Sequence, residues 1–179
     1  MMQTLFQNPL AGPSVLGITS GSTLGVALAI FSVQIFGFTG ITMDVTVSSM
    51  AIVGGLLVTV LLLFFSKFLK KSNTLLIVGL MVGYFISSIV NVFSYYGDKT
   101  SLQSFVYWTF GSFEKEIDLS VLFNYYIIIS LLVVGVFLLQ KPLNLLLMGE
   151  KYAVSLGLNL SRTRILIMCI VGVLVGVIT

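Results

Sequence analysis

Long apolar stretches separated by short charged clusters constrain this chain more than any other feature. Four stretches contain no Asp, Glu, Lys or Arg: residues 14–36, 45–66, 74–95 and 120–140. Each reaches the length of about 20 residues that a transmembrane helix needs, and a fifth stretch covers residues 165–179. We therefore expect an all-α, polytopic membrane protein, with about five transmembrane helices in one segment that covers the whole chain.

The composition excludes several other classes of protein. Hydrophobic residues make up 58% of the 179 residues and charged residues only 8%, with a mean hydropathy of +1.13, so the chain lacks the polar surface of a soluble globule. It has no histidine and one cysteine, Cys169, which excludes Ser-His-Asp triads and imidazole-ligated metals. We expect no enzymatic activity, no catalytic residue, no metal site and no cofactor. The net charge of +3 gathers at the edges of the apolar stretches, which argues against nucleic-acid binding.

The ends of the sequence predict a piece of a longer chain. The fifth apolar stretch reaches Thr179 after about 15 residues, which is short for a membrane span. Residues 1–10 contain no basic region followed by an apolar core, so we expect no cleavable signal peptide.

The charged residues between the stretches predict how the chain lies in the membrane. If successive stretches cross, seven positive charges and one negative charge fall on one side: Lys67, Lys70, Lys71, Lys141, Lys151, Arg162, Arg164 and Glu150. Two positive and five negative charges fall on the other side: Lys99, Lys115, Asp44, Asp98, Glu114, Glu116 and Asp118. Because basic residues are retained on the cytoplasmic side, we expect residues 1–13 and the segment 141–162 to be cytoplasmic.

The apolar stretches carry no ionisable group that could relay a proton or bind a coupling ion, which disfavours a self-powered proton transporter. The chain also lacks the G-x-x-x-x-G-K-[ST] loop that holds nucleotide phosphates. If the protein moves a solute, its energy comes from a partner subunit.

Small residues recur at a spacing of four in the first stretch, at Gly17, Gly21 and Gly25, beside several hydroxyl residues. Such a face allows two helix backbones to approach closely. It is compatible both with tight helix packing and with a polar wall along a translocation path. Gly172 and Gly176 repeat the spacing in the fifth stretch, and we interpret that pair as packing residues.

The third stretch repeats the pattern with Gly79, Gly83, Ser87 and Asn91. An asparagine at membrane depth seeks either a partner on another helix or a water-filled cavity. Gly79 and Gly83 are predicted to pack, and Ser87 and Asn91 either bond between helices or line a pathway.

Two segments outside the spans also carry information. Residues 107–113 (YWTFGSF) mix aromatic and small residues, which is typical of an interfacial aromatic belt or of a docking surface for an external protein. Within residues 141–162, glycines at 149 and 157 predict two short helices. Leu145, Met148, Tyr152 and Leu156 recur at helical spacing, so this segment lies on the lipid surface or enters a groove of a partner.

Three ordered motifs resemble permeases of ABC importers for iron-siderophores, haem and cobalamin. They are residues 2–21 (MQTLFQNPLAGPSVLGITSG), residues 107–113 and residues 142–157 (PLNLLLMGEKYAVSLG). The resemblance covers essentially the whole chain, and the first motif is the most specific.

The resemblance implies a permease of about ten helices in the bacterial plasma (inner) membrane, of which this chain represents the end of helix two, helices three to six, a cytoplasmic coupling loop and most of helix seven. It implies a second permease subunit as a homodimer partner, a cytoplasmic ATP-binding subunit and an external substrate-binding protein. Gly149, Glu150, Ala153 and Gly157 resemble the motif that couples to the ATPase. Ser72 and Asn73 fall where the family narrows its path into a gate, although both residue types also cap helices.

We therefore expect a transmembrane permease segment of an ABC importer for an iron-siderophore or a related metal chelate such as haem or cobalamin. A secondary carrier or channel-like protein without an ATPase is the alternative, and a non-transporting membrane fragment is a third.

Overall fold

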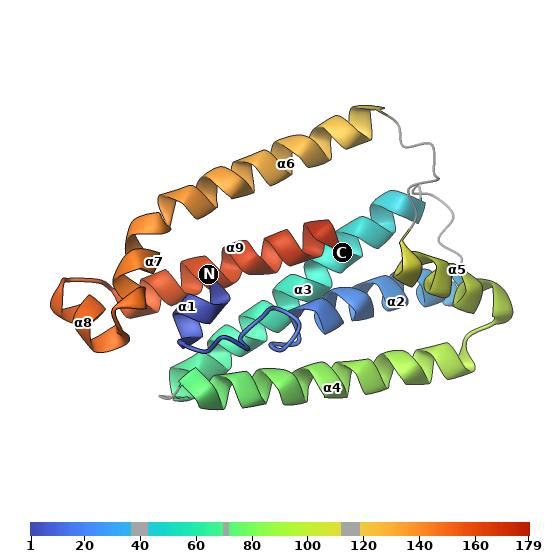
Figure 1. Cartoon of the computed structure of the whole chain (residues 1–179). Helices are drawn as coiled ribbons and strands as arrows, with labels where there is room; N and C mark the ends of the chain where they lie inside the picture. The colour runs from blue at the N-terminus through green and yellow to red at the C-terminus, as the bar shows by residue number, and fades with distance from the viewer. Residues whose placement is uncertain (37–42, 70–71, 112–118) are drawn as a thin grey trace.

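The computed structural model describes residues 1–36, 43–69, 72–111 and 119–179, and every regular element in these ranges is an α-helix (Figure 1). The helices are α1 (Met2–Phe6), α2 (Ile18–Phe36), α3 (Met43–Phe68), α4 (Ser72–Tyr96), α5 (Lys99–Phe110), α6 (Leu119–Leu138), α7 (Gln140–Leu147), α8 (Glu150–Ser155) and α9 (Leu160–Ile178). The expectation of an all-α polytopic membrane protein is confirmed.

Three described helices are long and apolar enough to cross a membrane: Thr46–Phe68 in α3, Thr74–Tyr96 in α4 and Leu160–Ile178, which is α9. A fourth span arises if α6 and α7 are taken together, with a bend of 47° between Tyr126–Leu138 and Gln140–Leu147. In α2 the described apolar part, Ile18–Ser32, is shorter.

Two helices begin elsewhere than their apolar stretches predict. The first helix begins at Ile18 and not at residue 14, because residues 13–17 form turns that end with Gly17 at φ 73°. The last helix begins at Leu160 and not at residue 165, because the Asn159 side chain accepts a hydrogen bond from the Arg162 amide at 3.1 Å and caps it. Arg162 and Arg164 therefore lie within α9.

Most of the helices form a packed body, whereas α6 and the pair α7 and α8 leave more of their side chains exposed. Helix α2 packs against α3, α4 and α9, and α3 packs against α9. Helix α6 contacts this body through α9, and most of its described side chains are exposed. Helices α7 and α8 lie at the end of the molecule where α3 ends and α4 begins, and α5 lies at the opposite end. We call the first of these the basic end, because Lys67, Lys141, Lys151, Arg162 and Arg164 all lie there.

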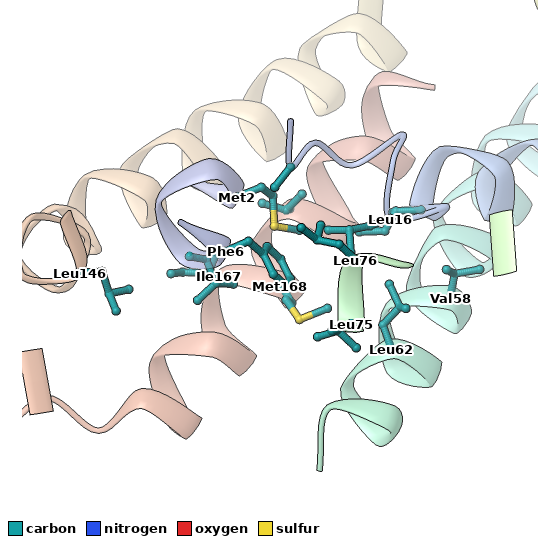
Figure 2. Close-up of a cluster of buried hydrophobic side chains, with 14 of the residues drawn as sticks. Met2, Phe6, Leu16, Val58, Leu62, Leu75, Leu76, Leu146, Ile167 and Met168 are labelled. Atoms are coloured by element: carbon teal, nitrogen blue, oxygen red, sulfur yellow. The ribbon is translucent and has the colours of Figure 1, made fainter. Parts of the chain in front are cut away.

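The larger apolar cluster joins the N-terminal segment to the helices of the basic end (Figure 2). Its fully buried members include Leu5, Phe6, Leu16, Leu62, Leu75, Leu146, Ile167 and Met168. These residues come from α1, α3, α4, α7 and α9 and from the turn before α2. A five-residue helix such as α1 is not stable alone, so this burial holds the N-terminal segment in place.

The second cluster attaches α5, which the sequence interpretation treated only as an aromatic segment. Phe105 of α5 is buried against Phe31 of α2, with ring centroids 5.9 Å apart, and Trp108 stacks on Phe105 at 6.1 Å. Tyr107 and Phe110 are exposed. The aromatic residues of this segment thus divide between a packed face and an exposed face; the last two residues of the motif, at 112 and 113, lie outside the described residues.

Candidate translocation face and coupling segment

Glycines bring α2 and its preceding turn against α4 at backbone distance. A Cβ atom built on Gly17 would lie 2.8 Å from the Cα of Gly83, and one built on Gly79 would lie 3.0 Å from the Cα of Leu16. Gly17 also has a positive φ, which other residues rarely adopt. Three of the glycines singled out in the sequence, at 17, 79 and 83, therefore lie together at this crossing.

The other side of α2 meets α3 just as closely. A Cβ atom on Gly21 would lie 2.7 Å from the carbonyl oxygen of Gly54, and one on Gly25 would collide with the carbonyl oxygen of Met50. Such close approach is typical of membrane helix pairs, in which van der Waals contact rather than water exclusion stabilises association.

Small residues also mediate the contact between α3 and α9. A Cβ atom on Gly172 would lie 2.5 Å from the Oγ1 of Thr59, and one on Gly176 would lie 2.6 Å from the Cα of Ile52. The Thr59 hydroxyl donates to the carbonyl of Gly55 at 2.9 Å, so its polar group is satisfied within its own helix. Helices α2, α3 and α9 consequently form one close-packed unit.

A hollow of about 280 Å³ opens between the turn before α2, the start of α2 and the middle of α4. Its lining residues are Ser14, Val15, Ser20, Leu80, Gly83, Tyr84 and Ser87. The Ser87 hydroxyl donates to the carbonyl of Gly83 at 2.9 Å and is half-buried. Ser87 thus lies at a hollow with a partly polar lining, although its own hydrogen bond is made within α4.

The outer face of α4 continues beyond this hollow and is not covered by the described helices. Tyr84, Ser88 and Asn91 are exposed along it. The Asn91 side chain makes no hydrogen bond to another residue in the described ranges, so the interhelical bond weighed from the sequence is not formed there. The side chains of Ser72 and Asn73, the predicted gate, lie outside those that the structure describes, and only their place in the first turn of α4 is known.

The predicted coupling segment folds as two short helices, and the prediction of a break at Gly149 and an end near Gly157 is confirmed. Gly149 and Gly157 have φ values of 108° and 88°, while a Cβ on either would meet no atom within 4 Å. Backbone conformation, not lack of space, therefore calls for glycine at both positions. Between them, Ala153 is fully buried, whereas Glu150 is half-buried.

The surface of α7 and α8 mixes exposed polar residues with large apolar ones. Its large exposed side chains are Leu147, Met148, Tyr152, Val154 and Leu156. Leu146 and Ala153 point inward and anchor the two helices to the body. The pair therefore presents large apolar side chains to its surroundings while two buried residues attach it to the body.

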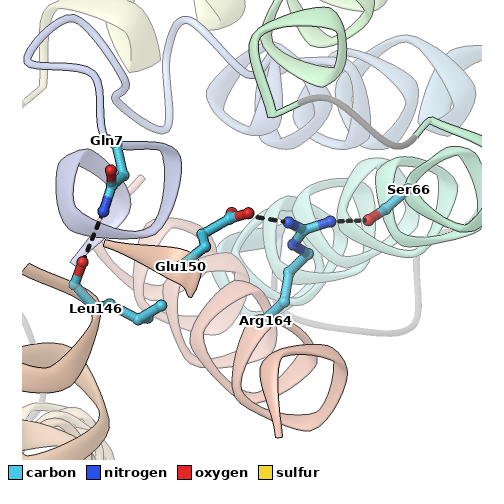
Figure 3. A network of polar contacts seen from close by, with 5 residues as sticks. All are labelled: Gln7, Ser66, Leu146, Glu150 and Arg164. Carbon is cyan, nitrogen blue, oxygen red and sulfur yellow. Dashed lines mark hydrogen bonds and ion pairs between the residues drawn. The ribbon is translucent and has the colours of Figure 1, made fainter. Parts of the chain in front are cut away.

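Polar contacts add to this attachment (Figure 3). The Gln7 side-chain amide donates to the carbonyl oxygen of Leu146 at 2.7 Å, near the end of α7. Arg164 of α9 donates to the Oγ of Ser66 at 3.0 Å and forms an ion pair with Glu150 at 3.4 Å. These contacts could not be predicted from the sequence, because the partners are far apart along the chain and no local spacing signals them.

These features define a polytopic helical membrane protein with a close-packed glycine-lined body, a partly polar open helix face and an apolar helical segment between two spans. The sequence matches the FecCD transport family over residues 1–179, and the chain belongs to that family.

Individual relatives agree with this assignment. An ABC transporter permease protein of Methanocaldococcus jannaschii is 32% identical over 178 residues, which are 99% of this chain and 50% of that protein. The vitamin B12 import system permease protein BtuC of Klebsiella pneumoniae is 35% identical over 179 residues, or 99% of this chain and 51% of BtuC. The chain therefore spans about half the length of these relatives.

A solved structure supports the same fold. It is an inward-facing conformation of a metal-chelate type ABC transporter, matched with a TM-score of 0.82 and 32% identity over 98% of this chain and 54% of that chain. The suspected membership of a metal-chelate permease family is thus confirmed at the level of family and fold.

Proposed function

We propose that the chain acts within the permease of an ABC importer that takes up a metal chelate, with iron-siderophores, haem and cobalamin as the candidate substrates. The observation that carries the proposal is the family match along all 179 residues. The similarity to a vitamin B12 permease and to a metal-chelate type transporter favours large metal complexes over small ions.

The partners belong to the same proposal. A cytoplasmic ATP-binding subunit supplies energy, an external substrate-binding protein delivers the chelate, and a second permease copy completes the path through the bacterial inner membrane. The absence of acidic or basic residues from the apolar stretches supports an external source of energy.

The path is assigned to the exposed face of α4 and the adjoining hollow. Ser87 lines the hollow and Asn91 is exposed on the same helix, so both place polar atoms where a solute could pass. Ser72 and Asn73, in the first turn of this helix, are proposed to form the gate at its cytoplasmic mouth. The glycines of α2 and α4 hold this wall against the body.

The segment from Gly149 to Gly157 is proposed as the contact with the ATP-binding subunit. Its apolar side chains suit a groove on a partner protein, since exposed apolar patches of this kind mark interaction sites. Glu150 and Ala153 fix how that surface is presented, one by its ion pair and the other by burial.

Uptake assays test the substrate and the energy source together. Cells that make the protein, and cells in which its gene is deleted, are given ferrichrome-bound radioactive iron, haem or cyanocobalamin, with and without depletion of ATP. We expect gene-dependent uptake of one of these chelates that stops when ATP is removed. Uptake that persists without ATP but collapses with the proton gradient would favour the secondary carrier instead.

Co-purification tests the coupling contact. The variant Gly157→Ala forces a side chain into a positive φ at a cost of about 1–2 kcal/mol, so we expect weaker recovery of the ATP-binding subunit with the tagged permease. Gly12→Ala is the control, because its Cβ would meet only the Ser14 Oγ at an ordinary 3.8 Å. Equal recovery with both variants would refute the assignment of this segment.

A further inference from the structure

One arginine joins three helices at the basic end of the molecule. Arg164, in the first turns of α9, donates through Nη1 to the Oγ of Ser66 near the end of α3, at 3.0 Å. Through Nη2 it reaches the Oε1 of Glu150, the first residue of α8, at 3.4 Å. Figure 3 shows its guanidinium group between the two partners.

The geometry of the guanidinium suits this junction. It is planar and carries five N–H donors in a fixed fork, so partners bonded to different nitrogens are held at a defined angle to each other. Arg164 is 18% exposed and Glu150 37%, which leaves the junction partly shielded from water. A lysine, with its charge at a single point, can reach one partner but does not fix the angle between two.

Among the described residues, helix α8 buries a single small side chain against the body. It follows Gly149, whose φ of 108° marks a sharp change of chain direction after α7, and it contributes one buried residue, Ala153. The hydrogen bond from Gln7 to Leu146 anchors α7, on the other side of this glycine, and does not involve α8. The contact of Glu150 with Arg164 therefore helps to set the orientation of α8 relative to α3 and α9.

We propose that Arg164 is a positioning residue that makes α8 move together with the basic ends of α3 and α9. This inference rests on the proposed function, in which the segment that contains α8 contacts the ATP-binding subunit. In this arrangement Glu150 acts through Arg164, and a displacement of α8 reaches α3 directly. Because α3 is in backbone contact with α2 at Gly54, the displacement then reaches the close-packed unit.

A merely stabilising ion pair gives a different expectation. A partly exposed pair contributes little to stability, so removal of Arg164 has a small effect on unfolding if that is its whole role. If Arg164 is instead a positioning residue, its removal changes the orientation of α8 and lowers the amount of chelate taken up per ATP hydrolysed. The ATP-binding subunit still binds.

The test compares Arg164→Met with Arg162→Met in the assembled transporter. Arg162 lies in the same turn of α9 and is exposed, which makes it a matched control. Nitroxide labels on Ser155→Cys in α8 and Ser104→Cys in α5, in a Cys169→Ala background, report the position of α8 as a distribution of distances. Separate unlabelled samples give ATP hydrolysis, recovery of the ATP-binding subunit and uptake of whichever of ferrichrome, haem and cyanocobalamin the wild type transports.

We expect Arg164→Met to broaden the distance distribution and to lower uptake per ATP hydrolysed by about fivefold, with the ATP-binding subunit still bound. Glu150→Gln shifts both readouts in the same direction, Arg164→Lys recovers them in part, and Arg162→Met leaves both unchanged. If Arg164→Met and Arg162→Met give the same distance distribution and the same uptake per ATP hydrolysed, with the ATP-binding subunit bound in each, this inference is overturned. The proposed function then still stands. Failure of the wild-type protein to bind any ATP-binding subunit would instead overturn the proposed function, and the inference with it.

Discussion

Replacement of Gly21 by alanine tests whether backbone contact between α2 and α3 holds the body together. The new Cβ would lie 2.5 Å from the Cγ2 of Val58 and 2.7 Å from the carbonyl oxygen of Gly54, against an ordinary contact of 3.4 Å or more. The valine can rotate its side chain, whereas the carbonyl belongs to the backbone of α3. The two helices must therefore separate by about 0.7 Å at this point, which opens gaps along a tightly packed interface.

Overpacking of this kind costs about 1–3 kcal/mol, and the higher helix propensity of alanine returns up to about 1 kcal/mol. We expect a net loss of about 1–2 kcal/mol in the free energy of unfolding. Gly135→Ala in α6 is the matched control, because its Cβ would meet only the Cδ1 of Ile170 at 3.7 Å. That variant keeps the gain in propensity without the clash and is neutral or stabilised.

Unfolding of the purified protein by SDS titration in mixed micelles, followed by loss of helical circular dichroism, gives the two free energies. The difference between the variants at 21 and 135 is the informative quantity, since both replace a glycine within an apolar helix. If Gly21→Ala is as stable as Gly135→Ala, the α2–α3 interface is not the rigid contact described above.

Two further substitutions examine local attachments. Phe105→Ala removes a buried ring from beside α2 at a cost of about 3 kcal/mol. Helix α5 then detaches, and tryptic cleavage at the exposed Lys99 becomes faster. Phe110→Ala, which removes an exposed ring, leaves the rate of cleavage unchanged. Asn159→Ala removes the cap of α9 and lowers the free energy of unfolding by about 1 kcal/mol, measured by the same SDS titration. Ser161→Ala, at an exposed position of the same turn, leaves it unchanged. Equal midpoints for the two variants would show that the cap is dispensable.

Much of the fold could be predicted because the thickness of the membrane sets the length of an apolar stretch that crosses it as a helix. The ends of the helices were less accessible. A capped helix extends past the apolar stretch into water, and Arg162 and Arg164 therefore belong to α9 although they are charged. Helix α5 was missed because it has only 12 residues and mixes polar and aromatic side chains, so its burial depends on Phe31 far away in the sequence.

Some features of the candidate site could likewise be predicted from the sequence, and others could not. The break at Gly149 and the end at Gly157 could be read from the sequence, because a positive φ favours glycine and leaves a local signature. The link from Arg164 to Ser66 could not be read, because it joins residues 98 positions apart and depends on how α3 and α9 pack. Local conformation is encoded locally, whereas the angle between two helices is set by every residue in their interface.

The distribution of close contacts limits which parts of this molecule can move relative to one another. Helices α2, α3 and α9 touch through glycines with almost no free space, so sliding one along another would bring backbone atoms into collision. Helix α6 is mostly exposed and meets α7 at a bend of 47°. Helix α4 is held to α2 on one face and is open on the other. In the proposed transport cycle we therefore expect α2, α3 and α9, with the part of α4 that Gly17 contacts, to move as one body, and α6 to move relative to them.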